Sequence, residues 1–322
     1  MRASVPAKVF LLGEYAVLAG LPAALVAIGP RFSAETAPNS GEGAGSDSVA
    51  PRSPWGKLEA HARTRLPLKF SDPFRGAGGF GASTAQFALA YASWHGMPEF
   101  NGSGAEIAGA RAEYAVQAWK LYRELGSDEP VPPSGADLVA QIQGGATVFD
   151  PTARACASIP SGPGAGIRWD SFLVFSATGQ EGRKVATHVH LPELASGKSL
   201  ESGSVLIRAL ERPLREGLQA LERGDTLGLG RAMHDYGRAL WSQGLEIEAT
   251  SRDRFALGML PGVLAIKGAG ALQADALVAL IDPALEGEAA VVARRKLIEE
   301  AANRGLKLVC DGIRPEEGLR GA

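Results

Sequence analysis

Residues 76–85 form a glycine-rich segment that runs directly into a predicted helix at 83–94. The segment reads Gly-Ala-Gly-Gly-Phe-Gly-Ala-Ser-Thr-Ala, and glycine lets backbone amides approach an anion closely. A helix N-terminus adds unpaired N–H groups and the positive end of a dipole. The segment therefore indicates a phosphate-binding site. It is not a Walker A loop, because no Gly-Lys-Ser/Thr closes it. The alternative is a plain glycine turn in which Ser83 or Thr84 caps the helix.

Three further segments place charged residues beside apolar runs or glycines. Lys8 starts an apolar run that ends with Gly-Glu at 13–14, and Asp137 closes Pro-Ser-Gly-Ala-Asp at 133–137. The third, 265–275, reads Ala-Ile-Lys-Gly-Ala-Gly-Ala-Leu-Gln-Ala-Asp. A carboxylate such as that of Asp137 can accept a proton from a hydroxyl group, but it is equally suited to capping a helix after Ser-Gly. A strand, turn and helix without any ligand would also explain the third segment.

In chain order, the four segments resemble the motifs of the GHMP small-molecule kinases, which include galactokinase, homoserine kinase, mevalonate kinase and phosphomevalonate kinase. The most specific motif is Lys8-Val-Phe-Leu-Leu-Gly-Glu14-Tyr15, followed by Ala-Val, and it looks most like the mevalonate-pathway members. Residues 79–85 resemble Gly-Leu-Gly-Ser-Ser-Ala-Ala, and residues 133–137 resemble Pro-Ser-Gly-Val/Ile-Asp. Galactokinase is disfavoured, because its N-terminal sugar-recognition signature is absent.

The resemblance implies an α+β, two-domain GHMP kinase fold. Residues 1–160 would form an N-terminal, ATP-binding half similar to domain 2 of ribosomal protein S5, and residues 161–322 a ferredoxin-like C-terminal half. The active site would lie between them. A break rich in Pro and Gly places the boundary near 155–168. Strands and helices that do not alternate regularly as βαβ units also indicate the α+β class.

The resemblance further implies an ATP-dependent phosphotransferase of the mevalonate pathway of isoprenoid biosynthesis, with Mg²⁺ as cofactor. Phosphomevalonate is the preferred acceptor, because Asp275 stands in the position typical of phosphomevalonate kinases and a doubly anionic acceptor needs cations beyond Lys8. Mevalonate is the alternative, which Pro-Ser-Gly-Ala-Asp favours. Homoserine kinase and mevalonate-diphosphate decarboxylase fit less well. A non-catalytic relative that binds a nucleotide or metabolite is the alternative from another class.

The resemblance also gives roles to individual residues. Asp137 is the expected general base, and Lys8 would stabilise charge on the transferred phosphoryl group. Ser83 keeps a hydroxyl that helps to hold Mg²⁺ in the family, and Glu124 is the expected second metal ligand, with Glu113 as the other candidate. We expect ATP at Gly78, Gly79, Gly81, Ala82, Ser83 and Thr84, and the acceptor at Glu14, Tyr15, Arg183, Lys184, Lys267, Gly270 and Asp275.

Two departures from the family pattern bear on these roles. Ala82 replaces the first serine of the second motif, and Leu272, Gln273 and Ala274 replace three glycines of the third. Side chains then stand where bare backbone normally lines the site. This predicts an altered phosphate or substrate geometry, and it supports the non-catalytic alternative.

A polar segment at 178–188 follows a predicted strand. Arg183 and Lys184 are suited to binding a phosphate or carboxylate, or they lie at a solvated hairpin tip. His188 and His190 are two residues apart on a presumed strand and so share a face. We do not expect a metal site there, because no third ligand is nearby.

The composition and net charge of the chain argue against several classes of function. The 322 residues have a net charge of −2, which argues against a nucleic-acid or anionic-membrane partner. No apolar run approaches the ~20 residues of a membrane span, and residues 9–12 are too short for a signal peptide. The two cysteines lack CxxC spacing and fit a reducing cytoplasm. We therefore expect a cytoplasmic protein with a small-molecule substrate, as a monomer or homodimer.

Hydrophobic periodicity predicts further elements. We expect residues 38–54 to form a polar loop, which is either a surface insertion or a flap beside a nucleotide. Pro213 should kink or split the helix that contains it. The predicted strands are 9–12, 23–28, 31–36, 169–175 and 307–310, and the further predicted helices are 58–66, 105–124, 134–145, 206–221, 227–241 and 287–303.

Overall fold

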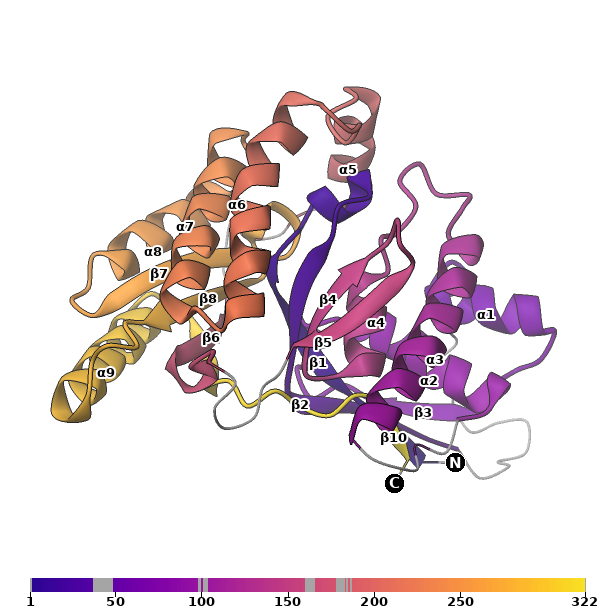
Figure 1. Ribbon diagram of the computed structural model, residues 1–322. Helices are drawn as coiled ribbons and strands as arrows, with labels where there is room; N and C mark the ends of the chain where they lie inside the picture. Colours follow the sequence, from indigo (N-terminus) through magenta and orange to yellow (C-terminus); the bar gives the residue numbers. More distant parts are fainter. Residues whose placement is uncertain are drawn as a thin grey trace.

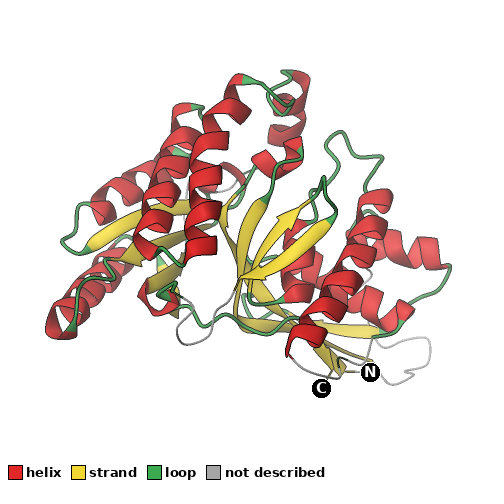
Figure 2. Ribbon diagram, in the orientation of Figure 1, coloured by secondary structure: helices red, strands yellow, loops and turns green. Residues whose placement is uncertain are grey.

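The computed structural model describes residues 2–36, 49–97, 100, 104–159, 166–177, 183, 185 and 187–321, with the side chains of 187–189 excepted. The described strands form two antiparallel sheets (Figures 1 and 2). The first has the order β10-β1-β2-β4-β5, with β3 paired to β2, and the second has the order β7-β8-β6-β9. The first sheet consists of β1 Arg2–Leu12, β2 Ala23–Thr36, β3 Leu68–Ser71, β4 Ala146–Asp150, β5 Ala155–Ile159 and β10 Arg320–Gly321; the second of β6 Phe172–Ser176, β7 Val263–Ala269, β8 Ala276–Ile281 and β9 Lys307–Asp311.

The first sheet is built around the long pair β1 and β2, both of which are largely buried. Helices α2 and α4 pack against this pair, and α3 packs against α4. Because α2 and α4 both contact β1, the strand that carries Lys8 lies beside the helices that follow the glycine-rich and Pro-Ser-Gly segments. The four helices of this half are α1 Pro54–Ala62, α2 Ala82–His95, α3 Gly104–Leu125 and α4 Ala136–Gln143.

The second sheet is covered by helices from the second half of the chain. Helices α7 and α8 pack against β7, and α9 contacts β8 and β9. Helix α6 pairs with α7 and also contacts the turn after β1, so it reaches the first half. The helices here are α5 Thr187–Ser196, α6 Val205–Arg223, α7 Thr226–Ser242, α8 Glu248–Gly258 and α9 Gly287–Asn303. Among the described helices, none is long and apolar enough to cross a bilayer.

The two halves are continuous in the core and in the chain. One hydrophobic cluster includes residues from both sheets. After β9 the chain returns to the first sheet, where Glu317 bridges to Gly144 and β10 pairs with β1. The expected break near 155–168 coincides with the connection between the two sheets, but the last residues pack with the first half. The division into 1–160 and 161–322 remains a prediction.

Most expected elements are present, and three differ. Strands 23–28 and 31–36 are one strand, β2. Helix α6 is a single helix with Pro213 inside it, so it is not split in two, and the alternative of a kink stays a prediction. His188 and His190 lie on helix α5 rather than on a strand, so the expected strand was wrong. Most of the expected loop 38–54 falls on 37–48, outside the described residues.

Candidate active site

Lys8 is the point at which three of the sequence motifs meet. It is buried on β1, and its Nζ lies 3.3 Å from Oδ2 of Asp137. The same ammonium donates a hydrogen bond to the carbonyl oxygen of Gly79 at 3.0 Å, and the backbone N–H of Lys8 donates to the carbonyl oxygen of Phe80 at 3.2 Å. One side chain thus connects the first strand, the glycine-rich segment and the Pro-Ser-Gly-Ala-Asp segment.

The glycine-rich segment needs its glycines for two reasons. Gly76, Gly79 and Gly81 all have positive φ angles, between 83° and 88°, a conformation that other residues rarely adopt. A Cβ on Gly81 would also lie 3.1 Å from Cε of Lys8. The segment is therefore a tight turn that brings bare backbone against Lys8, at the N-terminus of α2.

Gln141, on α4, holds this turn in place. Its Oε1 accepts a hydrogen bond from Oγ1 of Thr84 at 2.7 Å, and its Nε2 donates to the carbonyl oxygens of Pro6 and Gly81 at 3.0 and 3.1 Å. Sequence reasoning missed Gln141, because a glutamine four residues after Asp137 on a helix carries no distinctive signal. Thr84 is buried in this contact, whereas Ser83 is exposed on the cavity side.

A cavity of about 480 Å³ opens at this point. Most of the predicted site residues line it. Among the described residues that line it, the charged ones are one cation, Lys8, and three carboxylates. The lining residues that we expected are Lys8, Glu14, Tyr15, Gly78, Gly79, Gly81, Ala82, Ser83, Thr84, Asp137, Gly270 and Asp275.

Asp275 packs against the glycine-rich segment from the second half of the chain. A Cβ on Gly78 would lie 2.5 Å from its Oδ1, and a Cβ on Gly79 would lie 2.7 Å from its Cβ. Burial raises the pKa of the Asp275 carboxyl, although Lys8 acts to lower it. Asp275 therefore connects the third motif to the glycine-rich turn of the first half.

Glu14 and Tyr15 make a second connection between the halves. Oε1 of Glu14 lies 2.5 Å from Nζ of Lys267, which also donates to the carbonyl oxygen of Gly268 at 2.6 Å. The hydroxyl of Tyr15 accepts a hydrogen bond from the N–H of Leu272 at 2.8 Å and lies 3.1 Å from Nε2 of His190. Burial raises the pKa of Tyr15.

The residues that replace the family's glycines keep a glycine-like backbone at two positions. Leu272 and Gln273 have φ angles of 48° and 57°, in the left-handed region that favours glycine. Gln273 is fully buried, and its Oε1 lies 3.3 Å from Nζ of Lys267. The altered third motif therefore places a side chain beneath the cavity, next to the ion pair.

The structure does not bring every predicted residue to the cavity. Lys267 is fully buried behind Glu14. Arg183 is buried in an ion pair with Asp253 and donates to Oγ1 of Thr250 at 3.0 Å. Glu124 is exposed on α3 and does not line the cavity, and Glu113 is exposed on the same helix. Lys184 lies outside the described residues.

Two further features were not anticipated. The hydroxyl of Tyr236, on α7, donates to the carbonyl oxygen of Glu14 at 2.6 Å. A second cavity of about 340 Å³ adjoins the first and shares Tyr122, Val131, Pro133 and Leu191 with it.

Within the described residues, no cluster of three or more His, Cys, Asp or Glu side chains is arranged to hold a metal ion. The fit of a metal here therefore depends on single residues such as Ser83.

Comparison with known proteins gives one curated relative and many related structures. No protein-family model matches the chain. A mevalonate kinase from Aeropyrum pernix is 27% identical over 281 residues, covering 77% of this chain and 79% of the relative. The mevalonate kinase of Methanococcus jannaschii superimposes with a TM-score of 0.64 at 14% identity, covering 96% of each chain.

Two other solved structures are equally similar in fold. The phosphomevalonate kinase of Streptococcus pneumoniae gives a TM-score of 0.64 at 14% identity, covering 98% of this chain and 99% of that one. A galactokinase of Lactococcus lactis in complex with galactose gives 0.67 at 11% identity, covering 100% and 95%. These structures share the α+β two-domain fold over nearly the whole chain. Structures of kinases named for three different substrates superimpose on this chain about equally well. The similarity in fold therefore does not identify a substrate.

Proposed function

Since this chain belongs to the GHMP kinase superfamily and is distantly related to mevalonate kinase, we propose that it transfers the γ-phosphate of ATP to the hydroxyl group of a small acceptor. The observation that carries the proposal is the position of Lys8, which contacts both Asp137 and the glycine-rich turn in one cavity. A kinase needs a base, a cation and a phosphate-binding loop at one point. A protein that only bound a nucleotide would not need Asp137 beside Lys8.

The two adjoining cavities accommodate the two parts of a nucleotide. The phosphates would bind at the N-terminus of α2, on the backbone of the turn that ends at Gly81. The second cavity has an apolar and aromatic lining that includes Phe87, Tyr122 and Leu125, with Lys57 at its wall. Such a lining suits an aromatic base. The shared residues between the cavities support one continuous nucleotide site.

Ser83 is the described residue best placed to hold Mg²⁺, because it is exposed into the cavity on the first turn of α2. Magnesium usually binds one or two protein oxygens together with substrate phosphates, so a site with few protein ligands fits. When bound, the metal supplies charge neutralisation for the phosphate oxygens. We do not include Glu124, since it lies on the exposed side of α3.

Asp137 and Lys8 divide the work of phosphoryl transfer. The carboxylate of Asp137 takes the proton of the acceptor hydroxyl as that oxygen attacks. The ammonium of Lys8 stabilises the negative charge that remains on the transferred group. Both side chains are held before substrate binds, Lys8 by the Gly79 carbonyl and Asp137 by the first turn of α4. The catalysis is therefore mainly positioning and electrostatics.

Among acceptors, we propose mevalonate ahead of phosphomevalonate, which reverses the order expected from the sequence. The cations invoked for an acceptor phosphate were Arg183, Lys184 and Lys267. Arg183 and Lys267 are buried in ion pairs, and neither lines the cavity. Of the described lining residues, Lys8 is the one cation beside three carboxylates. An acceptor phosphate would meet more negative than positive charge there.

A coupled ADP-release assay tests the proposal. The purified chain is given Mg·ATP with mevalonate, phosphomevalonate, homoserine or galactose, and kcat/KM is compared. We expect mevalonate to exceed phosphomevalonate by at least about tenfold, which is ~1.4 kcal/mol in transition-state binding. A preference for phosphomevalonate would overturn the acceptor assignment alone. ATP binding by calorimetry without ADP release from any acceptor would favour the non-catalytic alternative.

A further inference from the structure

Asp275 places a carboxyl group against bare backbone at the wall of the candidate active-site cavity. It precedes β8 in the second half of the chain, and its side chain lines the cavity. Its Oδ1 lies 2.5 Å from the position that a Cβ on Gly78 would take, and Gly270 of the third motif packs against Oδ2. Neither glycine can carry a side chain without displacing this carboxyl. Asp275 is thus in direct contact with the glycine-rich turn.

The charge around Asp275 is mainly negative. Lys8 lies 3.3 Å from Asp137, and Nζ of Lys267 lies 2.5 Å from Glu14, so each of these two ammonium groups is engaged by another carboxylate. Among the described lining residues, three carboxylates share one lysine. The titratable side chains that face Asp275 across the cavity, or contact one that does, are Lys8 on β1, Glu14 and Tyr15 after β1, Asp137 on α4, and His190 on α5 beside the Tyr15 hydroxyl.

A bound phosphate and an ionised Asp275 are poorly compatible at this place. In the proposed function the phosphates of ATP bind the backbone of the same turn that Asp275 contacts. Phosphate oxygens and an ionised carboxylate both only accept hydrogen bonds, and their charges repel. A protonated carboxyl has an O–H group to donate. Burial already raises the pKa of Asp275, although Lys8 acts to lower it, and a polyanion beside the carboxyl raises the pKa further.

We propose that Asp275 binds the nucleotide in its neutral form and donates a hydrogen bond from its carboxyl O–H to a phosphate oxygen of ATP. This inference rests on the proposed function, and it moves Asp275 from the acceptor, where the sequence placed it, to the nucleotide. The proton comes from the solvent, so the binding of one ATP takes up as much as about one proton. The same proton removes one negative charge from a cavity in which the described lining residues offer one lysine.

The affinity for ATP should therefore fall as the pH rises. Because the complex favours the protonated carboxyl, the pKa of Asp275 is higher in the complex than in the free chain. Affinity is highest below the pKa of the free chain and falls between the two pKa values, by as much as about tenfold per pH unit. The Asp275→Asn side chain stays neutral and keeps an N–H donor, so this variant should not lose affinity in that interval.

Isothermal titration calorimetry of the full chain measures this proton. The probe is the non-hydrolysable β,γ-imido analogue of ATP with Mg²⁺ and no acceptor, titrated between about pH 5.5 and about pH 8.5 in two buffers with different enthalpies of ionisation. The difference in heat between the buffers gives the number of protons taken up. We expect the unmodified chain to take up more protons than Asp275→Asn, by as much as about one per nucleotide, and to bind at least about tenfold more weakly than the variant at the highest pH.

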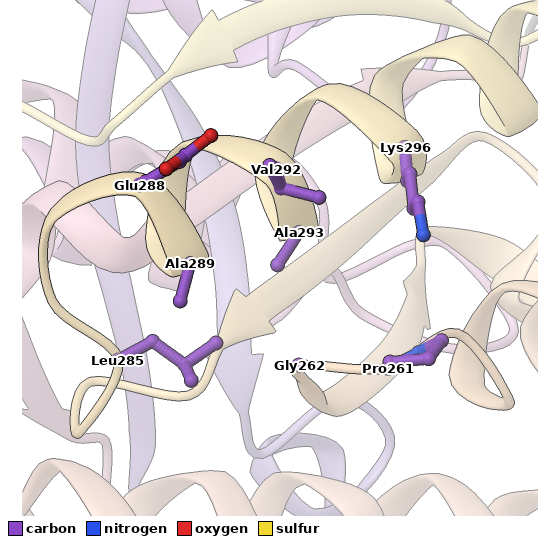
Figure 3. Close-up of a pocket in the computed structure, with 8 residues that line it drawn as sticks. All are labelled: Pro261, Gly262, Leu285, Glu288, Ala289, Val292, Ala293 and Lys296. Atoms are coloured by element: carbon purple, nitrogen blue, oxygen red, sulfur yellow. The ribbon is translucent and has the colours of Figure 1, made fainter.

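Glu288→Gln is the matched control, because it also replaces a carboxylate by an amide. Figure 3 shows Glu288 at the wall of an apolar hollow on α9, and this residue lines neither the candidate active-site cavity nor the cavity that adjoins it. The control should take up as many protons as the unmodified chain. Circular dichroism should be the same for all three proteins, since both substitutions keep the shape of the side chain.

The outcomes separate this inference from the proposed function. Equal proton numbers for the unmodified chain and Asp275→Asn would overturn the role of Asp275 alone, because the nucleotide would still bind. Weaker binding by Asp275→Asn at every pH would overturn it as well, because the carboxylate would then act as an anion, for instance toward the metal. A chain that binds no nucleotide at any pH would contradict the proposed function, and the role of Asp275 with it.

Discussion

Glu14 and Lys267 form a buried ion pair that joins the two halves of the chain. Glu14 follows β1, Lys267 lies on β7, and the two charged atoms are 2.5 Å apart. Lys267 has no exposed surface, whereas Glu14 forms part of the cavity wall. Lys267 therefore reaches the cavity wall through Glu14, and we expect it to position Glu14 rather than to contact a bound ligand.

We expect Lys267→Met to lower the free energy of unfolding by about 3–5 kcal/mol, because it leaves the carboxylate of Glu14 buried without its partner. The double variant Glu14→Gln/Lys267→Met removes both charges and should be more stable than Lys267→Met alone. Urea denaturation followed by tryptophan fluorescence measures both. Equal stability of the single and double variants would show that the pair contributes no coupling.

Asp137→Asn should lower kcat by about 10²–10⁴-fold, the range typical of a lost general base. The amide keeps the shape of the side chain but cannot accept the proton. The melting temperature should change little, since Asp137 is partly exposed. Asp235→Asn, at an exposed carboxylate on α7 outside both cavities, is the control and should keep full activity. Near-normal turnover in Asp137→Asn would remove it from the role of base.

Gly81→Ala and Gly76→Ala form a matched pair in the glycine-rich turn. Both glycines have φ near the same positive value, 88° and 83°, so a new side chain meets similar backbone strain at each. Only at Gly81 would the new Cβ press on Lys8 and Gln141; at Gly76 nothing lies within 4 Å. We expect Gly81→Ala to lower kcat/KM for ATP at least about tenfold more than Gly76→Ala. Similar losses of kcat/KM in the two variants would mean that backbone strain, and not the contact with Lys8 and Gln141, causes the effect.

Ser83→Ala and Glu124→Gln separate the two expected magnesium ligands. Because Ser83 faces the cavity and Glu124 does not, Ser83→Ala should raise the Mg²⁺ concentration needed for half-maximal activity. Glu124→Gln should leave that concentration within about twofold, as is usual for a surface change away from the site. A magnesium titration of ADP release gives both values. The opposite ranking would restore Glu124 as a ligand.

His190 should make stability depend on pH. Burial lowers its pKa below the ordinary value of 6.5, although Glu193 acts to raise it. The neutral ring is therefore favoured in the folded state, so its contribution is present above about pH 6.5 and is lost as the pH falls through and below it. Against His190→Gln, which cannot protonate, the wild-type chain should lose relative stability between about pH 7.5 and pH 5.5. A constant difference across this range would contradict the lowered pKa.

The sequence by itself predicted the fold class and most of the residues that line the cavity. Those predictions rested on residues that are close together in the sequence. The signals were a glycine turn before a helix, a lysine at the start of an apolar strand and an aspartate after Pro-Ser-Gly, and each indicates the local backbone structure. Helix α9 was placed within its observed bounds, 287–303, because its periodicity and the glycine that follows its end are both local signals.

Only the tertiary structure decided which charged residues face the cavity. Arg183 and Lys267 look in the sequence like free cations for a phosphate, but each is buried against a carboxylate distant in the chain, Asp253 or Glu14. A buried charge requires a partner, and no local pattern identifies a partner more than 60 residues away. For the same reason no sequence pattern indicated that Gln141 holds the glycine-rich turn, because that role exists only after α4 packs beside β1 and α2. Gln273 lies next to the ion pair of Lys267 and Glu14 only after the two halves have packed together.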